Sequence, residues 1–217
     1  MKSDLVNPWD EVYKRNGNVL GAPYRGFAKY LTQLKKISAK TILDLGCGTG
    51  RHAIPLYKNG FKPYAFDISA NAISQLRLEL SKQGFDHTDK IVIADMFEKF
   101  PYADDFFDCV ISIATIYHGT VNNIKFSLGE VKRILKSGGM FYFTTSVNIE
   151  NSKSINSGSN YILVEKGTFL PLDGREKHLV HHYFDKDELS KILSGDFKDI
   201  AINFDGDNYF EVYCFKK

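Results

Sequence analysis

The amino-acid sequence predicts an α/β fold, in which helices cover both faces of a mostly parallel sheet. Between residues 41 and 146, short apolar runs alternate with segments that carry apolar residues at helical spacing, which is typical of parallel strands joined by helices. The runs show little polar alternation, as expected for strands that are buried on both faces. Three glycines lie within five positions directly after the first run, which indicates a turn that binds a ligand.

The first half of the pattern predicts two strands and two helices. Residues 41–45 form a short apolar run that ends at the glycines, and a helix over 51–60 accommodates Pro55 only in its first turn. Residues 61–66 predict the second strand. A helix over 69–84 follows, because Ser69 or Asn71 can cap it and apolar residues recur at helical spacing.

The second half predicts three further strands and one helix. Residues 90–94 predict the third strand, and residues 107–115 predict a fourth that is almost entirely apolar or β-branched. A helix over 123–138 is expected to end at Gly138, and residues 140–146 predict the fifth strand.

Segments outside this alternation are expected to extend one domain of 217 residues. Residues 1–38 contain a leading helix and are expected to form a helical lid. Residues 147–183 predict an inserted loop and a hairpin of two strand-like runs around "LDGR", placed over the substrate side. A helix capped by Asp185 and a terminal hairpin, 198–204 with 209–215, complete the chain.

Composition and charge exclude several classes of protein. Apolar residues make up 43% and charged residues 25% of the chain, and the net charge of +2 is too balanced to indicate nucleic-acid binding. Three cysteines without a CxxC pair indicate a reducing compartment. No signal peptide is visible, and the longest apolar run is too short for a membrane helix, so we expect a cytoplasmic protein without a membrane partner.

The glycine turn "ILDLGCGTGRHAIPL" is compatible with more than one kind of ligand. A P-loop requires GxxxxGK[ST], and Gly50 is followed here by Arg51 and His52. A dinucleotide site has GxGxxG, whereas this spacing is GxGxG; Asp67, at the end of the second strand, suits a ribose in either case. Asp44, inside the first strand, is better placed near an ammonium than near a pyrophosphate. The ligand therefore has a cationic end and a ribose, as S-adenosylmethionine does.

Four stretches in order resemble the motifs of class I S-adenosylmethionine-dependent methyltransferases. These stretches are "ILDLGCGTG", "AFDIS", "IADMFEKFPYADDFFDCVIS" and "EVKRILKSGGMFYF". The resemblance implies a Rossmann-like three-layer sandwich with a seven-stranded sheet in the order 3-2-1-4-5-7-6, of which strand 7 is antiparallel. It favours the small-molecule type of methyltransferase.

The resemblance also implies which residues hold the cofactor. The methionine end would lie against Asp44 and the backbone of Gly46, Cys47 and Gly48. Asp67 would bind the ribose. The remaining expected contacts are Ile68 on the adenine, Asp95 on its amino group, Met96 beside the ring, and Ile113 and Ala114 below the sulfonium.

The loop after the fourth strand supplies the candidate catalytic residues. His118 is the candidate base and Tyr117 the candidate hydroxyl, at the sheet edge where ligands of open α/β sheets bind. An Asn/Asp-Pro-Pro-Tyr run and a Pro-Cys nucleophile are both absent here, so we expect no DNA substrate. A small molecule is the expected acceptor. The alternatives are an RNA or protein substrate and a non-catalytic regulatory module that binds S-adenosylmethionine. A monomer or homodimer is expected.

Further aromatic and histidine residues are candidates for the substrate side. Trp9, Tyr13, Tyr24 and Arg25 are expected to line the pocket or simply to dock a helix. The run "KHLVHHYF" predicts His178 and His182 on one face of a strand and His181 on the other. No third ligand follows at useful spacing, so no metal site is expected. Substrate contacts are expected from Arg175, His181 or Tyr183.

Overall fold

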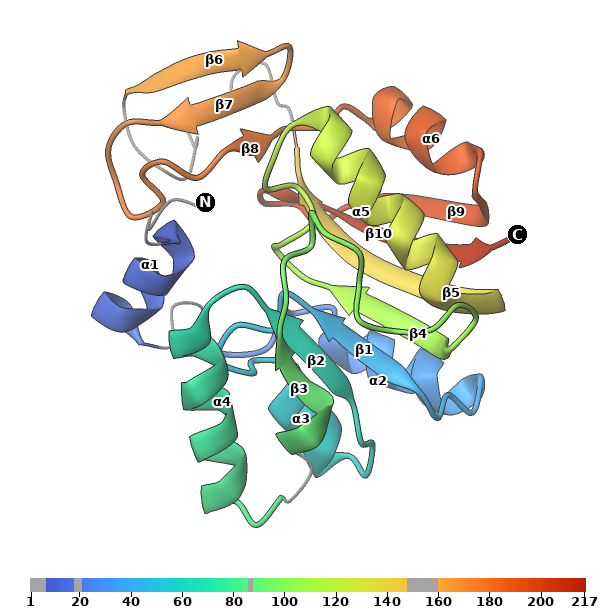
Figure 1. Cartoon of the computed structure of the whole chain (residues 1–217). Helices are drawn as coiled ribbons and strands as arrows, with labels where there is room; N and C mark the ends of the chain where they lie inside the picture. Colours follow the sequence, from blue (N-terminus) through green and yellow to red (C-terminus); the bar gives the residue numbers. More distant parts are fainter. Residues whose placement is uncertain (1–6, 18–20, 86–87, 148–159) are drawn as a thin grey trace.

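A computed structural model describes residues 7–17, 21–85, 88–147 and 160–217 of the chain. A seven-stranded sheet runs through the molecule with helices on both faces, and a small three-stranded sheet lies apart from it beside the first helix (Figure 1). The elements are α1 (Pro8–Asn16), α2 (Phe27–Lys36), β1 (Ile42–Leu45), α3 (Ala53–Lys58), β2 (Tyr64–Asp67), α4 (Ala70–Lys82), a 3₁₀ turn (Thr88–Lys90), β3 (Ile91–Ile93), β4 (Phe107–Ser112), α5 (Val121–Ile134), β5 (Leu135–Ser146), β6 (Tyr161–Glu165), β7 (Thr168–Pro171), β8 (His181–His182), α6 (Lys186–Ser194), β9 (Phe197–Phe204) and β10 (Tyr209–Lys216).

The strand order of the large sheet is β3-β2-β1-β4-β5-β10-β9. Strands β1 to β5 are parallel, and β10 pairs antiparallel with both β5 and β9. With β9 as the sixth strand and β10 as the seventh, this order confirms the predicted fold. Because β1 and β4 are adjacent and their connections leave in opposite directions, a crevice forms at their carboxyl ends.

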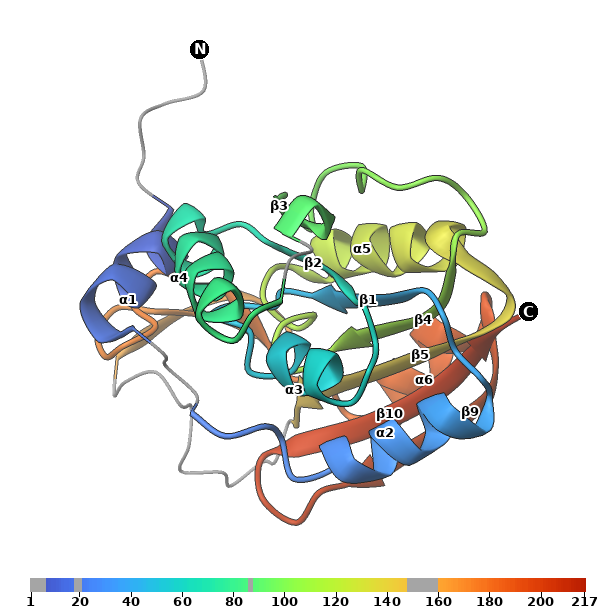
Figure 2. The same ribbon diagram turned by 90° about the horizontal axis from the view of Figure 1, so that it is seen from below.

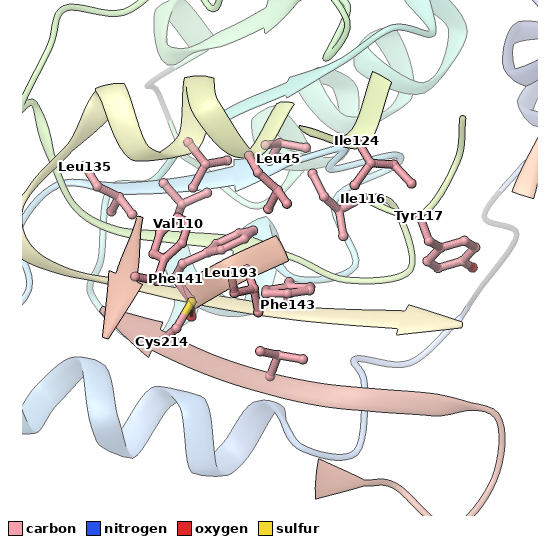
Figure 3. Close-up of a cluster of buried hydrophobic side chains, with 14 of the residues drawn as sticks. Leu45, Val110, Ile116, Tyr117, Ile124, Leu135, Phe141, Phe143, Leu193 and Cys214 are labelled. Carbon is pink, nitrogen blue, oxygen red and sulfur yellow. Dashed lines mark hydrogen bonds between the residues drawn. The ribbon is translucent and has the colours of Figure 1, made fainter. Parts of the chain in front are cut away.

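Apolar side chains fix the helices to the two faces of the sheet. Helices α2 and α3 cover one face and α5 the other (Figure 2). The cluster between α5, α6 and the sheet continues to Ile116 and Tyr117, beyond the end of β4 (Figure 3). Buried packing of this kind positions the loop that carries the candidate catalytic residues.

Two predicted boundaries in the middle of the chain are wrong. Helix α5 ends at Ile134 rather than Gly138, because Leu135 is already paired with Phe107 and fully buried in the sheet. Gly138 lies inside β5 with a φ of 71°. Strand β4 ends at Ser112 rather than Thr115, and Ala114 with a φ of 55° turns the chain into the next loop.

The inserted segment is also organised differently from the prediction. Its first tight turn lies at Lys166–Gly167, where Gly167 has a φ of 76°, and it joins β6 to β7. The "LDGR" stretch belongs to the connection between β7 and β8, so the segment forms three strands rather than two. Residues 148–159 of the predicted loop lie outside the described residues. The described helices include none that is long and apolar enough to span a membrane.

Candidate active site

A cavity of about 350 Å³ lies at the carboxyl ends of β1, β2 and β4. One part of its wall is the glycine turn together with the end of β2. The opposite part is formed by α1 and by the segment that precedes β8. In Figure 1, α1 and the β6–β8 sheet lie on the same side of the large sheet, beyond the ends of its strands. Such a cavity can enclose a small ligand between the sheet and a cover.

The glycine turn needs glycine at two positions, because both combine a left-handed backbone with no room for a Cβ atom. Gly46 and Gly48 have φ values of 70° and 53°. A Cβ atom at Gly46 would overlap the side chain of Thr115, and one at Gly48 would overlap the hydroxyl of Tyr13. The Cys47 side chain between them is buried, and burial raises the pKa of its thiol well above the ordinary value. Such a turn can fit closely around a ligand. Its buried thiol stays protonated and is not suited to act as a nucleophile.

Asp67 closes β2 beside the glycine turn. Its carboxylate accepts hydrogen bonds from the backbone N–H of Gly48 and of Ser69, both at 2.9 Å. Burial raises the pKa of Asp67 to about 6, although these backbone bonds oppose the shift. The oxygens keep lone pairs that two ribose hydroxyls could use.

Four other residues expected at the cofactor line the same cavity, and these are Ile68, Asp95, Met96 and Ile113. Asp95 is oriented by the Phe97 N–H, which donates to its Oδ1 at 2.8 Å. A glycine cradle, a buried carboxylate with free lone pairs and apolar side chains on one cavity therefore fit a sulfonium nucleoside.

Asp44 does not line this cavity. Its side chain is only 1% exposed, and its Oδ2 has no hydrogen-bond partner among the described residues. Burial raises the pKa of Asp44 to about 7, and the positive charge of Arg51 opposes the shift. The expected contact between Asp44 and the methionine end of the cofactor therefore stays a prediction.

His118 and Tyr117 line the same cavity. The Nδ1 atom of His118 is 2.8 Å from the carbonyl oxygen of Thr115, and its Nε2 atom is buried and has no hydrogen-bond partner among the described residues. Burial lowers the pKa of His118 to about 4, so the ring is neutral near pH 7. Burial also raises the pKa of Tyr117 well above its ordinary value, so its hydroxyl stays protonated.

The segment that leads into β8, together with β8 itself, brings two residues close to His118. Their spacing in the sequence did not indicate this contact. Gly119 N–H donates to the Val180 carbonyl at 2.8 Å, and His182 N–H donates to the Tyr117 carbonyl at 2.9 Å. These bonds place His181 against His118, with ring centroids 4.7 Å apart. Glu176 lies 3.3 Å from His181 between Oε2 and Nε2. No pattern in the sequence marked Glu176, because it lies in an irregular connection.

The predicted arrangement of the other two histidines is wrong. His178 precedes β8 and has a φ of 68°, so it shares no strand face with His182. His182 is buried and contacts Thr168 and Glu188, at 2.7 Å and 3.3 Å, away from the cavity. His118 reaches His181 from a loop 63 positions earlier, a proximity that sequence spacing did not indicate, so the absence of a metal site stays an untested expectation.

Helix α1 covers the cavity, but only part of the predicted aromatic set reaches it. Trp9 and Tyr13 line the cavity, and the Trp9 ring meets the His118 ring edge to face at 5.0 Å. Tyr24 and Arg25 instead contact Asp205. Arg175, His181 and Tyr183, expected near the substrate, all line the cavity.

Known proteins resemble this chain in sequence and in structure. The sequence model of one family, described as a methyltransferase domain, matches residues 36–195. An uncharacterised protein of Methanocaldococcus jannaschii, MJ1252, is 29% identical over 213 residues, which are 92% of this chain and 75% of that protein. Sarcosine/dimethylglycine N-methyltransferase of Halorhodospira halochloris is 35% identical over 111 residues, but the match covers 51% of this chain and 39% of that enzyme. The crystal structure of the PH0226 protein from Pyrococcus horikoshii OT3 superposes with a TM-score of 0.73 at 20% identity, over 95% of this chain and 99% of that one.

Proposed function

The chain belongs to the methyltransferase domain family, and we propose that it transfers the methyl group of S-adenosylmethionine to a small-molecule acceptor. It is a class I methyltransferase and S-adenosylmethionine is its cofactor, as the sequence motifs predicted. The observation that carries the proposed acceptor is the covered cavity. It joins the cofactor cradle to the unpartnered Nε2 of His118.

The cofactor end of the cavity is proposed to act through backbone and carboxylate groups. Gly46 and Gly48 keep the wall free of side chains, and Asp67 accepts hydrogen bonds from the ribose. Ile68 and Met96 contact the adenine, and Asp95 accepts from its amino group. When bound there, S-adenosylmethionine supplies an electrophilic methyl group on a positively charged sulfur.

The acceptor end is proposed to be the space beside His118. Methyl transfer is an in-line displacement, so the protein must hold the acceptor atom, the methyl group and the sulfur in a line. An acceptor that carries a proton must also lose it, and the neutral imidazole of His118 offers a free lone pair at Nε2 for that proton. Tyr117 supplies a protonated hydroxyl on the same wall. Trp9 and Tyr13 help to exclude water.

A small acceptor fits this cavity better than RNA or a protein chain does. Helix α1 and the segment before β8 enclose the acceptor end, and the nearly balanced charge of +2 does not favour binding to a nucleic acid. The three cysteines are free and buried, which supports the cytoplasm as the proposed compartment.

Labelled S-adenosylmethionine tests this proposal directly. The protein is incubated with a panel of thiols, amines, phenols and carboxylates, and in parallel with total RNA. We expect transfer to a small molecule and none to RNA. His118→Ala should slow turnover by about 100-fold or more while the Kd for S-adenosylmethionine changes by less than about twofold. Transfer to RNA alone, or an unchanged rate in His118→Ala, would contradict the proposal.

A further inference from the structure

We propose that His118, Glu176 and His181 bind a divalent transition-metal ion, with zinc as the favoured ion, at the acceptor end of the cavity. Each side chain offers one ligand atom, and these atoms all lie within 4.8 Å of one another. All three residues are buried and line the cavity. In the part of the chain that the structure describes, this is the one group of three such residues close enough to share an ion.

The orientation of His118 is that of a metal ligand. Its Nδ1 lies 2.8 Å from the Thr115 carbonyl oxygen, which can only accept, so Nδ1 must donate the ring proton. This tautomer leaves a lone pair on Nε2, which is buried and has no hydrogen-bond partner. A histidine that ligates a metal typically donates its other ring N–H to a carbonyl or carboxylate in this way.

Glu176 and His181 complete the donor set from the opposite wall. The Glu176 Oε2 atom and the His181 Nε2 atom are 3.3 Å apart, yet this contact lacks the geometry of a hydrogen bond, and His181 Nε2 is also without a partner. Two donors that each lie about 2.0–2.2 Å from a tetrahedral zinc ion are separated by a similar distance. Arg175 lies near the other Glu176 oxygen, with Nη2 at 3.5 Å from Oε1. That contact leaves Oε2 directed at the histidines.

The fold holds the two walls together. His118 and His181 are paired residues of an isolated antiparallel β-bridge, and the neighbouring Gly119 and His182 amides close hydrogen bonds across it. The backbone pairing therefore holds the segments that carry the three donor atoms close together. Two imidazoles and one carboxylate suit zinc or another transition metal, whereas magnesium and calcium prefer oxygen ligands. A zinc ion with three protein ligands keeps its fourth position open.

The open fourth position on the zinc ion indicates the class of acceptor that binds there. This step of the inference rests on the proposed function. A hydroxyl or thiol that binds the ion loses its proton to solvent, because a bound cation lowers the pKa of its ligand. A lone pair on that oxygen or sulfur then forms the bond to the methyl carbon. The methyl–sulfonium bond breaks and its electron pair remains on the cofactor sulfur. This arrangement keeps the proposed methyl transfer but replaces the base role proposed above for His118, because the Nε2 lone pair then binds the ion and the proton goes to solvent.

Metal binding is measured on the full chain, after treatment with a chelator and dialysis. Zinc is titrated by calorimetry and its stoichiometry is determined by elemental analysis, and cobalt(II) is added separately as a spectroscopic probe. We expect one zinc per chain and visible cobalt bands whose intensity reports a site of low coordination number. Glu176→Gln and, from the other wall, His118→Gln should each weaken zinc binding by about 100-fold or more, since even outer-shell partners contribute about 10–100-fold.

His178→Gln is the matched control, because His178 lines the same cavity but is not one of the three ligands. It should bind zinc as the unmodified chain does. Circular dichroism checks the fold of every variant. Absence of stoichiometric zinc in the unmodified chain, or equal zinc affinity in Glu176→Gln, His118→Gln and His178→Gln, would overturn the inference.

Calorimetry with S-adenosylmethionine on the chelated protein separates this inference from the proposed function. Binding of the cofactor without binding of zinc defeats the metal site alone. Binding of zinc without binding of the cofactor defeats the proposed function and leaves the metal site standing. If both bind, methyl transfer to the acceptor should fall at least about tenfold on chelation and return with zinc.

Discussion

At the scale of single residues, the site depends on carboxylates that the fold buries away from water, where their charged form is destabilised. Asp44 and Asp67 are both buried beside the glycine turn, and burial raises the pKa of each, to about 7 and about 6. Asp67 is compensated by two backbone N–H groups, whereas the Oδ2 atom of Asp44 has no hydrogen-bond partner in the part of the chain that the structure describes. Buried acids with raised pKa values are typical of functional sites.

Asp67→Ala should weaken the binding of S-adenosylmethionine. The variant removes the carboxylate proposed to accept both ribose hydroxyls, so we expect an increase in Kd of about 10–100-fold, or about 1.4–3 kcal/mol. Isothermal titration calorimetry measures this directly. Asp187→Ala is the control, because Asp187 is exposed on α6 and does not line the cavity. An Asp67→Ala protein with unchanged affinity would exclude the ribose role.

Asp44 gives the cofactor-free protein a characteristic dependence of stability on pH. Because its folded-state pKa lies above the unfolded value of 3.8, its favourable contribution is complete below pH 3.8 and is lost as pH rises through about 7. Between about pH 5 and 8, the contribution of Asp44 to the free energy of unfolding should therefore fall by about 1–3 kcal/mol as pH rises. Buried His118, whose pKa is lowered, contributes with the opposite sign in this range, so the Asp44 contribution is read from the difference between the unmodified chain and Asp44→Asn. Urea titrations at several pH values measure that difference, and a difference that does not change with pH would assign the effect to other groups.

At the scale of elements, one carboxylate makes three of the hydrogen bonds that fix helix α1 to the start of α4. Asp10 accepts hydrogen bonds from the Ser69 hydroxyl at 2.7 Å and from the Asn71 N–H and Nδ2 at 2.9 Å and 2.6 Å. Ser69 in turn caps α4 through the Ala72 N–H. The same few atoms therefore start α4 and hold Trp9 and Tyr13 over the cavity, which supports the proposed lid.

Asp10→Ala should loosen α1 without unfolding the sheet. We expect amide exchange in residues 8–16 to rise by about tenfold or more and the Kd for S-adenosylmethionine to rise by about 3–10-fold, because the cover closes less often. Hydrogen–deuterium exchange with mass spectrometry and calorimetry measure the two effects. Glu11→Ala is the matched control, since Glu11 forms ion pairs with Lys14 and Arg15 of its own helix. Equal exchange in both variants would show that Asp10 does not hold the lid.

At the scale of the whole molecule, the ligand joins parts of the chain that are far apart in sequence. The cavity is lined by α1, by the ends of β1, β2 and β4, and by the segment before β8. A compound that fills it stabilises all of these parts at once, because it binds only the folded chain.

S-adenosylmethionine should therefore raise the melting temperature of the protein. At about 100 times its Kd, a ligand adds about 2.7 kcal/mol, which for a chain of this size corresponds to about 5–10 °C. Differential scanning fluorimetry measures the shift, and the demethylated cofactor should give a similar one. Nicotinamide dinucleotide is the comparison compound, and a shift with that compound alone would contradict the assignment of the cofactor.

The sequence by itself determined the α/β fold, its resemblance to a family implied the order of the sheet, and the same motifs suggested the cofactor end of the site. Continuous apolar runs, helical spacing and the GxGxG turn are signals that lie within short stretches of the sequence. Along the chain, single elements separate the turn from the end of β2 and the end of β2 from the end of β3. Asp67, Ile68, Asp95 and Met96 could be proposed because each lies at or shortly after the end of a strand, and parallel strands end at one edge of a sheet.

Only the tertiary structure decided the acceptor end. The end of α5 depended on the pairing of Leu135 with Phe107, which local propensity does not encode. His118, Glu176 and His181 come from two segments with no shared periodicity, and the β-bridge that joins them is a long-range contact. The position of Glu176 within an irregular connection carries no pattern. Their proximity follows from chain packing over the cavity, and no spacing along the sequence could have revealed it.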